Sequence, residues 1–428
     1  MNEPEAHFLE QTGNLAATAG VLMTVGRNVG VGKPTTRPDY LPFGRPDFGD
    51  DEIAAVTRVL RSGWVGMGPE TITFEQELAD ACHAPHVVTV NSCTSALFLA
   101  LLVNGVKPGD EVVVPSLTWI STANAALHLG ATPVFCDIDP VTLNATPESV
   151  RACLTPRTRA IVVVHLGGLA ADVAAIRRVV PAHIAIVEDA AHAFGSRFAD
   201  GTPVGASGNL TCFSFYANKN LSTGDGGAIA LSSPRHADRL RSLRQHALPS
   251  DAWKRFTDAR KLSAGDVAEV GFKMNFTDLQ SSIGRVQLRR QEEFAERRLA
   301  IANYYAGAIA TMPWDIGVQH GVTDAGHARH LFLTQLPIDE IGRSRNEILM
   351  GLRARNIGAS VHYAPIHTMP LYAEWPTSLP VTEQVFERVL TLPISASMTL
   401  KDARDVMSAF EEELSSGPNH AALMRRVG

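Results

Sequence analysis

The sequence of 428 residues lacks the features that mark several classes of protein. No apolar run approaches the roughly 20 residues needed to span a bilayer, so we expect no membrane-spanning helix. Five cysteines without a CxxC pair indicate neither a disulfide framework nor a metal site. Lysine and arginine number 38 against 44 aspartates and glutamates, and no basic block suits nucleic acid. We therefore expect a cytoplasmic protein that binds no nucleic acid, no membrane and no metal.

The chain contains ample apolar material for more than one core. Its hydrophobic content is 45%, and its length exceeds what a single hydrophobic core usually supports. The N-terminal residues 1–40 are interpreted as a flexible leader. Their glycine-rich stretch lacks the spacing of a nucleotide-binding loop, because Pro34 stands after Lys33 where such a loop requires Ser or Thr.

Short apolar runs alternate with helical patterns from about Leu41 onward. This alternation is typical of βα units that build a largely parallel sheet. The runs expected as strands are His86–Val90, Glu111–Val114, Pro133–Cys136, Ala160–Val164, Ile184–Val187, Thr211–Phe215 and Ala228–Leu231. The sequence therefore predicts a large α/β domain over residues 41–275, with a mostly parallel seven-stranded sheet.

Capping residues mark the beginning of two expected helices. Thr146 can accept a hydrogen bond from the free amides of a helix whose first position is Pro147. Thr277 and Gln280 have the spacing of a capping box ahead of an apolar helix face. We expect this second helix to occupy residues 276–310 and to link two domains.

The C-terminal part of the chain has the pattern of a smaller α/β domain over residues 311–414. Its expected elements are a strand over His330–Leu336 and helices over Ser344–Arg355, Val381–Leu390 and Leu400–Leu414. A further strand is expected between the first two of these helices. Residues 415–428 show no periodicity and are interpreted as a tail.

A lysine and an aspartate stand at positions that suit covalent catalysis. Lys219 follows an apolar strand within the glycine-rich loop of Cys212–Ala230. A lysine in a low-polarity pocket can lose its proton and form a Schiff base with a carbonyl, although a lone loop lysine is usually solvated. Asp189 ends another apolar strand, where open α/β sheets bind ligands. Its alternative role is to cap the next helix.

Two further segments add hydroxyl groups and an aromatic ring. Ser92, Thr94 and Ser95 lie where a strand meets a helix, and helix amides attract phosphate there, although such residues can equally be simple caps. Trp119 follows a strand and is either a core residue or a platform for a flat ring. Pyridoxal phosphate needs these groups together with a lysine and an acid at its ring nitrogen. We therefore predict pyridoxal 5′-phosphate as the cofactor.

These segments resemble the DegT/DnrJ/EryC1/StrS family of sugar aminotransferases over residues 41–414. The motifs that carry the resemblance are SGWVGMGP (62–69), GDEVVVPSLTWISTANAALHLGATPVFCDID (109–139), EDAAHAFG (188–195), FSFYANKNLSTGDGG (213–227), FKMNFTDLQSSIG (272–284), RHLFLTQ (329–335) and VHYAPIH (361–367). PSLTW and His192 are most similar to the branch that makes UDP-4-amino-4-deoxy-L-arabinose. The resemblance implies the large-domain fold of aspartate aminotransferase, which is fold type I of pyridoxal-phosphate enzymes.

The resemblance also implies a role for individual residues. Lys219 would form the Schiff base and Asp189 would pair with the ring nitrogen. His192 would lie by the phenolic oxygen of the ring, where many relatives have Gln, and Trp119 would stack on the ring. The residues placed at the phosphate are Thr94, Ser95, Ser214 and, from the neighbouring subunit, Asn275. A homodimer with shared active sites follows from this last assignment.

Three histidines match family positions near the substrate, although each can also be a satisfied core histidine. They are His165, His330 and His362. The chain departs from the family pattern at Gly66 and Met67, where two threonines are usual, and at Tyr216, where His is common. Because these positions flank the pocket, the identity of the sugar stays open.

The predicted reaction is transfer of an amino group from L-glutamate to a keto group of a nucleotide-activated sugar, which leaves 2-oxoglutarate. One alternative is an aminotransferase for a cyclitol or another cyclic ketone in antibiotic biosynthesis. Another is a catalytically inactive paralogue that binds the cofactor and keeps the fold. The joint presence of Lys219, Asp189 and Trp119 argues against the inactive paralogue.

Overall fold

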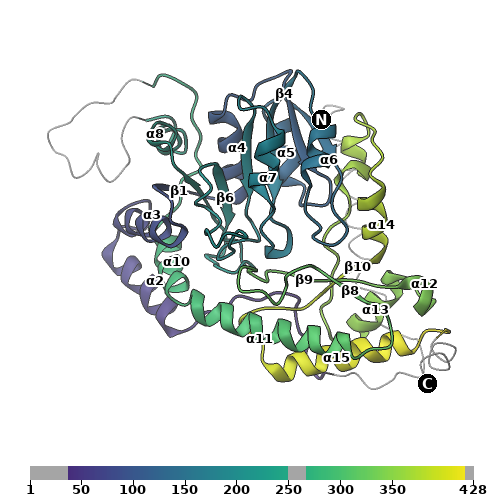
Figure 1. Ribbon diagram of the computed structural model, residues 1–428. Helices are drawn as coiled ribbons and strands as arrows, with labels where there is room; N and C mark the ends of the chain where they lie inside the picture. The colour runs from purple at the N-terminus through teal and green to yellow at the C-terminus, as the bar shows by residue number, and fades with distance from the viewer. Residues whose placement is uncertain (1–36, 249–266, 420–428) are drawn as a thin grey trace, which may run out of the picture.

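A computed structural model describes residues 37–248 and 267–419, organised around two β-sheets (Figure 1). Nearly all of the predicted leader over residues 1–40 lies outside these ranges, as do residues 420–428 of the predicted tail. Within the described ranges, no helix combines the length and hydropathy that crossing a membrane requires.

The larger sheet has seven strands. They are β1 (His86–Val90), β2 (Glu111–Pro115), β3 (Thr132–Cys136), β4 (Thr158–Val164), β5 (Ala185–Asp189), β6 (Leu210–Ser214) and β7 (Gly227–Leu231). Their order across the sheet is β1-β7-β6-β5-β4-β2-β3. Only β7 runs against its neighbours, since it pairs antiparallel with both β1 and β6. The predicted mostly parallel seven-stranded sheet is therefore confirmed.

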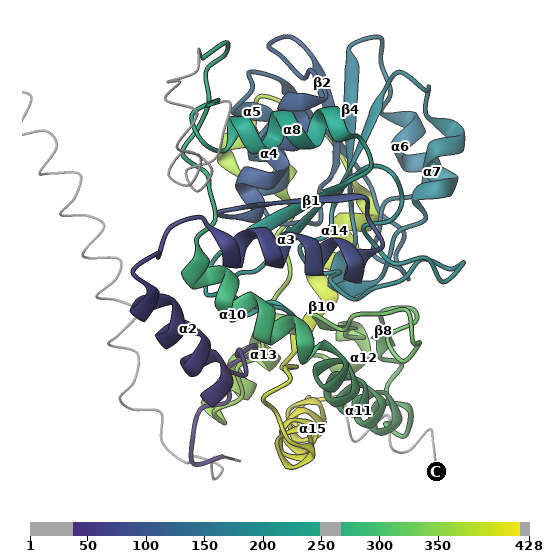
Figure 2. The ribbon, with the colours of Figure 1, turned by 90° about the vertical axis from the view of Figure 1, so that its left-hand side faces the viewer.

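Helices cover both faces of this sheet. They are α3 (Pro69–Cys82), α4 (Cys93–Val103), α5 (Ser121–Leu127), α6 (Pro147–Ala152), α7 (Val173–Val179) and α8 (Pro234–Leu243). Helices α4, α5 and α8 pack on one face, and α3, α6 and α7 pack on the other (Figure 2). Strands covered on both faces read as continuous apolar runs, which is why the sequence located them within one or two residues.

The connection after the sheet consists of two helices that meet at Arg290. They are α10 (Asp278–Arg289) and α11 (Gln291–Ala310). Thr277 caps α10, as predicted, by accepting a hydrogen bond from the Gln280 amide at 3.3 Å. The prediction of one helix over residues 276–310 was wrong in one respect, because Arg290 interrupts it. The Arg290 side chain turns to Asp47 and Glu52, beside the preceding helix α2 (Asp50–Ser62).

The smaller sheet is antiparallel and has the order β10-β9-β8. Its strands are β8 (Gly317–Val318), β9 (Phe332–Gln335) and β10 (Val389–Leu392), and the helices in this part are α12 (Ile338–Ile341), α13 (Arg345–Ala354), α14 (Pro380–Arg388) and α15 (Leu400–Ser415). The strand expected before α14 comes after it instead, as β10. Residue Leu41, far away in sequence, pairs with Ile357 and packs in the core of this part. The division into two domains and a linking helix stays a prediction.

Residues 357–372 run from the smaller sheet back to the larger one. Ser360 bridges to Thr391 in β10 at the beginning of this segment. At its end, Tyr372 donates a hydrogen bond of 2.6 Å to Asn124 in α5. Between these points His367 contacts Ser116, which directly follows β2, with 2.7 Å between Nδ1 and the hydroxyl oxygen. The segment is therefore fastened to both sheets.

Candidate active site

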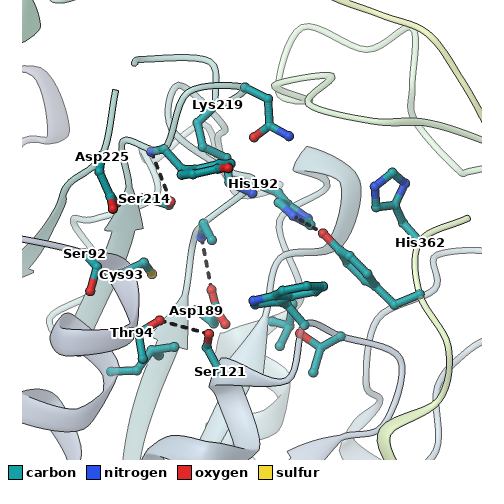
Figure 3. Close-up of a pocket in the computed structure, with 18 residues that line it drawn as sticks. Ser92, Cys93, Thr94, Ser121, Asp189, His192, Ser214, Lys219, Asp225 and His362 are labelled. Atoms are coloured by element: carbon teal, nitrogen blue, oxygen red, sulfur yellow. Dashed lines mark hydrogen bonds between the residues drawn. The ribbon is translucent and has the colours of Figure 1, made fainter. Parts of the chain in front are cut away.

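A cavity of about 510 Å³ opens at the carboxyl ends of β1, β2, β4, β5 and β6 (Figure 3). The predicted site residues that line it are Thr94, Trp119, Asp189, His192, Ser214, Lys219 and His362. Because the strand ends meet at one edge of the sheet, residues from distant parts of the sequence converge there.

Lys219 lies in the loop between β6 and β7, and it is half-buried. The Lys219 amide donates to the Tyr216 carbonyl at 2.9 Å, which fixes the loop at this point. Burial lowers the pKa of Lys219 to about 8, although nearby Cys93 and Asp189 act in the opposite direction. Roughly a tenth of Lys219 is therefore an unprotonated amine at pH 7, far more than for an ordinary lysine, and this is the form that a nucleophile requires.

Asp189 is a buried carboxylate at the end of β5, with 5% of its surface exposed. It accepts hydrogen bonds from the Thr122 hydroxyl at 2.8 Å and from the Ala191 amide at 3.1 Å. Burial raises the pKa of Asp189, and these two hydrogen bonds only partly offset that rise. In the described part of the chain Asp189 forms no ion pair, so its negative charge would be stabilised by a cationic ligand group.

His192 lies across the cavity from Ser92 and Thr94 (Figure 3). It forms a hydrogen-bonded pair with Tyr363. Nδ1 of His192 accepts from the Gly167 amide at 3.3 Å, and Nε2 lies 3.0 Å from the Tyr363 hydroxyl. Burial and the nearby Lys219 lower the pKa of His192 well below its usual value, so the ring is neutral. Its single proton therefore lies on Nε2 and is donated to Tyr363, which leaves the phenol hydrogen free to turn toward the cavity.

His362 precedes Tyr363 and lies 2.9 Å from the Thr391 hydroxyl through its Nδ1. Burial lowers the pKa of His362 to about 3, with a further contribution from Lys219. The histidines of the cavity are thus hydrogen-bonding groups and not cations at neutral pH.

The amino end of helix α4 forms another wall of the cavity. Ser92 caps the helix by accepting from the Ser95 amide at 3.1 Å, and Thr94 lies 2.9 Å from the Ser121 hydroxyl. A Cβ atom on Gly227 would be 2.6 Å from the backbone carbon of Ser92, so glycine lets β7 pass close to the start of the helix. The helix amides and these hydroxyls together suit a phosphate group.

Four predicted site residues do not line the cavity of their own chain. The Ser95 hydroxyl donates to the side-chain oxygen of Asn91 at 2.7 Å, and the side-chain amide of Asn275 donates to the Phe276 carbonyl at 3.1 Å. His165 is fully buried, with Nδ1 accepting from the Ala171 amide at 3.0 Å. His330, the fourth, touches Lys219.

The sequence model of the DegT/DnrJ/EryC1/StrS aminotransferase family matches residues 46–411, which include every residue that lines the cavity. The chain belongs to this family. It is an aminotransferase that depends on pyridoxal phosphate, with the type I fold of such enzymes.

Individual family members resemble the chain over most of its length. SpsC of Bacillus subtilis, a spore coat polysaccharide biosynthesis protein, is 41% identical over 386 residues, which are 88% of this chain and 97% of SpsC. The aminotransferase TlmJ from Streptoalloteichus hindustanus is 35% identical, with a TM-score of 0.79 over 88% of this chain and 99% of TlmJ. Spr1654 from Streptococcus pneumoniae is described as a sugar aminotransferase, and its structure is solved in PMP and PLP forms. The PMP form is 30% identical to this chain, with a TM-score of 0.80 over 88% of this chain and 99% of Spr1654.

The cavity of this family member fits the cofactor. Asp189 supplies a buried carboxylate without a cation, which suits a protonated ring nitrogen. Lys219 supplies the amine, and Trp119 keeps 56% of its surface exposed beside the cavity, as a platform for a flat ring does. The start of α4 would hold the phosphate.

Sequence reasoning missed several residues of this site. Thr122 donates a hydrogen bond to Asp189. It lies three residues after Trp119, and residues with this spacing lie on the same face of a helix, so the sequence did contain a signal. Tyr363 belongs to a motif that carries the family resemblance, but nothing local indicates that it reaches His192. Of the three hydroxyl residues expected at the phosphate segment, Ser92 and Thr94 line the cavity, whereas Ser95 does not.

Proposed function

We propose that this aminotransferase moves an amino group from L-glutamate to a keto group of a nucleotide-activated sugar. The observation that carries the proposal is that Lys219, with its lowered pKa, and the buried Asp189 line one cavity beside the exposed Trp119. Sequence similarity to SpsC and to Spr1654 supports a sugar as the acceptor. The cavity volume of about 510 Å³ lies within the usual range for small-ligand sites.

The lining of the cavity supports a polyhydroxylated substrate. Hydroxyl and amide side chains face it from several elements, namely Ser92, Thr94, Thr118, Ser121, Ser214 and Asn218. Tyr216, which has 53% of its surface exposed, and Trp119 border the same cavity and offer flat apolar surface. Such surface suits the base of a nucleotide, and the polar groups suit sugar hydroxyls.

Each catalytic group has a distinct task in this proposal. When bound, pyridoxal phosphate supplies an electron sink for charge that develops on the substrate carbon. Asp189 would keep the ring nitrogen protonated, and the Lys219 amine would hold the cofactor covalently. The freed Nζ of Lys219 would then move a proton between the substrate carbon and the cofactor carbon. His192 keeps the Tyr363 hydroxyl oriented by donating to it.

The decisive experiment runs the reaction backwards with purified holoenzyme. Nucleotide-linked amino sugars, free amino sugars and aminocyclitols are each offered with 2-oxoglutarate, and L-glutamate formation is measured. We expect turnover with at least one nucleotide-linked amino sugar and none with its free sugar. Turnover confined to aminocyclitols would establish the alternative acceptor class.

A second measurement separates an active enzyme from an inactive paralogue. Adding L-glutamate to the holoenzyme should change the visible absorbance of the bound cofactor and release one equivalent of 2-oxoglutarate per site. L-Aspartate, L-alanine and L-glutamine serve as alternative donors. A spectrum that no amino donor alters would support the inactive paralogue.

We also propose a homodimer in which Asn275 contacts the phosphate in the partner's site. Asn275 does not line the cavity of its own chain, which supports a role across an interface. Mixing inactive Lys219→Ala chains with inactive Asn275→Ala chains should restore activity in one of the two sites of each mixed dimer. No recovery despite demonstrated subunit exchange would show that each chain builds its own site.

A further inference from the structure

His330 is a buried histidine that contacts Lys219 from outside the cavity lining. Its Nε2 lies 3.3 Å from Nζ of Lys219, and 3% of its surface is exposed. It comes from the residues that lead into β9, so the contact joins the smaller sheet to the loop between β6 and β7. Its other ring nitrogen, Nδ1, is buried and has no hydrogen-bond partner in the described part of the chain.

The unpartnered Nδ1 decides where His330 carries its proton. Burial, followed by the charge of Lys219, lowers the pKa of His330 well below its usual value, so the ring is neutral. A neutral imidazole has one N–H donor and one acceptor nitrogen. A proton on Nδ1 would leave a buried donor unsatisfied, which is rarer in proteins than an unsatisfied acceptor. The proton therefore lies on Nε2, which faces Lys219.

A donor at Nε2 discriminates between the two charge states of Lys219. An ammonium group has three N–H donors and no acceptor, so it would face the imidazole donor to donor. An unprotonated amine has a lone pair that accepts the hydrogen bond. The His330 ring is restrained in this position because it packs on the His192 ring, with centroids 4.5 Å apart and 35° between the planes.

We propose that His330 is a positioning residue that keeps the freed Nζ of Lys219 as an unprotonated amine. When Lys219 takes a proton from the substrate carbon, its contact with His330 becomes unfavourable. Lys219 therefore passes the proton on and does not retain it. This inference rests on the proposed role of Lys219 as the group that moves the proton, and it is independent of which sugar binds.

The charged and titratable groups around this pair come from every neighbouring element. Burial lowers the pKa of Lys219, while Cys93 of α4 and Asp189 of β5 raise it. The other groups are His192, His362, Tyr363 and Arg298. All of them are unchanged when His330 alone is substituted, so the substitution isolates the effect of its imidazole.

The test measures the protonation of Lys219 in the cofactor-free protein. An acylating reagent that reacts only with unprotonated amines is applied across a pH series, and mass spectrometry follows the Lys219 peptide. The wild type should give a midpoint near the pKa of about 8. His330→Gln should raise the midpoint by about one pH unit, because its carboxamide can turn to accept from the ammonium. His330→Phe should give a midpoint no lower than the wild type.

The opposite pattern would overturn the proposal. If His330 accepts a hydrogen bond from a Lys219 ammonium, His330→Phe lowers the midpoint and His330→Gln leaves it unchanged. The matched control is His367→Gln, which alters a buried histidine that contacts Ser116 and Glu383 and should keep the wild-type midpoint. Labelling needs neither cofactor nor sugar, so an incorrect substrate assignment does not affect it.

A second readout applies to the holoenzyme. In His330→Gln the acidic limb of the kcat–pH profile should shift to higher pH by about one pH unit, the same amount as the labelling midpoint. A uniform loss of kcat at every pH would show a merely structural role and contradict the proposal. Circular dichroism of each variant establishes that the compared proteins are folded.

Discussion

Glu188 and Asp189 are consecutive residues at the end of β5, and they face opposite sides of the sheet because strand side chains alternate. Glu188 accepts hydrogen bonds from His165, at 3.0 Å, from Asn209, at 2.8 Å, and from Ser207. Burial raises the pKa of Glu188, but these three donors outweigh burial, and its pKa is lower than usual. Glu188 is therefore a satisfied buried anion.

Asp189 is equally buried but has fewer donors. Among the described residues, only the Thr122 hydroxyl and the Ala191 amide donate hydrogen bonds to its carboxylate, and its pKa is raised. The end of β5 therefore carries a fully hydrogen-bonded carboxylate on one face and a carboxylate suited to binding a ligand on the other. On the face toward α6 and α7 the carboxylate of Glu188 has its hydrogen-bond donors within the protein. On the face toward the cavity the carboxylate of Asp189 is left for the cofactor, its proposed partner.

The largest effect on the cavity side should come from Lys219→Ala. Without this amine, nothing holds the cofactor covalently or moves the proton, so 2-oxoglutarate formation should fall by about 10⁴-fold or more. The circular dichroism spectrum should match the wild type, because the hydrogen bond that fixes the loop at this point comes from the Lys219 backbone amide, which alanine retains. Turnover close to the wild-type rate would remove Lys219 from the mechanism.

Asp189→Asn should lower kcat by about 10²–10³-fold. The amide keeps the size of the side chain but removes the charge that protonates the ring nitrogen. The control is Glu188→Gln, the same chemical change one residue earlier on the other face, which should reduce kcat far less once folded protein is compared. Equal losses of kcat in the two variants would contradict the proposal that Asp189 acts in catalysis and Glu188 does not.

The same two substitutions should change the stability of the cofactor-free protein in opposite directions. Glu188→Gln should destabilise it by about 1–3 kcal/mol at neutral pH, since an amide nitrogen then faces hydrogen-bond donors. Asp189→Asn should stabilise it, because it removes a buried charge that has no cation. Urea unfolding at neutral pH measures both effects.

The pH dependence of these differences follows from the directions of the pKa shifts. A lowered pKa means that ionised Glu188 stabilises the fold above its ordinary pKa of 4.5, and this contribution is lost as the pH falls through the folded value. The raised pKa of Asp189 has the reverse sign, so its cost is present at neutral pH and disappears as the pH falls toward 3.8. Both stability differences should therefore shrink in acid.

The smallest effect should come from Thr122→Val. Losing one hydrogen bond to Asp189 raises the pKa of that carboxyl further and should weaken cofactor binding by about tenfold or less. Thr211→Val, in β6, is the matched control, because its buried hydroxyl has no hydrogen-bond partner in the described residues. Fluorescence titration of both variants with pyridoxal phosphate gives the two dissociation constants.

The sequence predicted those features that leave a local pattern. Buried strands appear as apolar runs, and Lys219 and Asp189 were found because each directly follows or ends such a run. The break at Arg290 could not be predicted, because the local sequence favours a helix and the break accompanies contacts with Asp47 and Glu52. Likewise β10 was assigned in part to a helix, because its residues become a strand only by pairing with β9.

Site geometry was harder to predict wherever it depends on distant contacts. His165 matched a family position near the substrate, yet it lies against Glu188 on the far side of the sheet. Strand alternation contained the signal, since Glu188 must face away from Asp189. The contacts of Tyr363 with His192 and of His330 with Lys219 cross between separate parts of the chain, and no spacing in the sequence indicates them.

The cavity is built from two separate parts of the chain. Its floor, with Lys219 and Asp189, stands on the large sheet, whereas His362 and Tyr363 arrive on the segment 357–372, which is tied down at Ser360 and Tyr372. The two anchors are separate from the residues that border the cavity. The side chains that this segment adds to the cavity wall can therefore change while both anchors are kept.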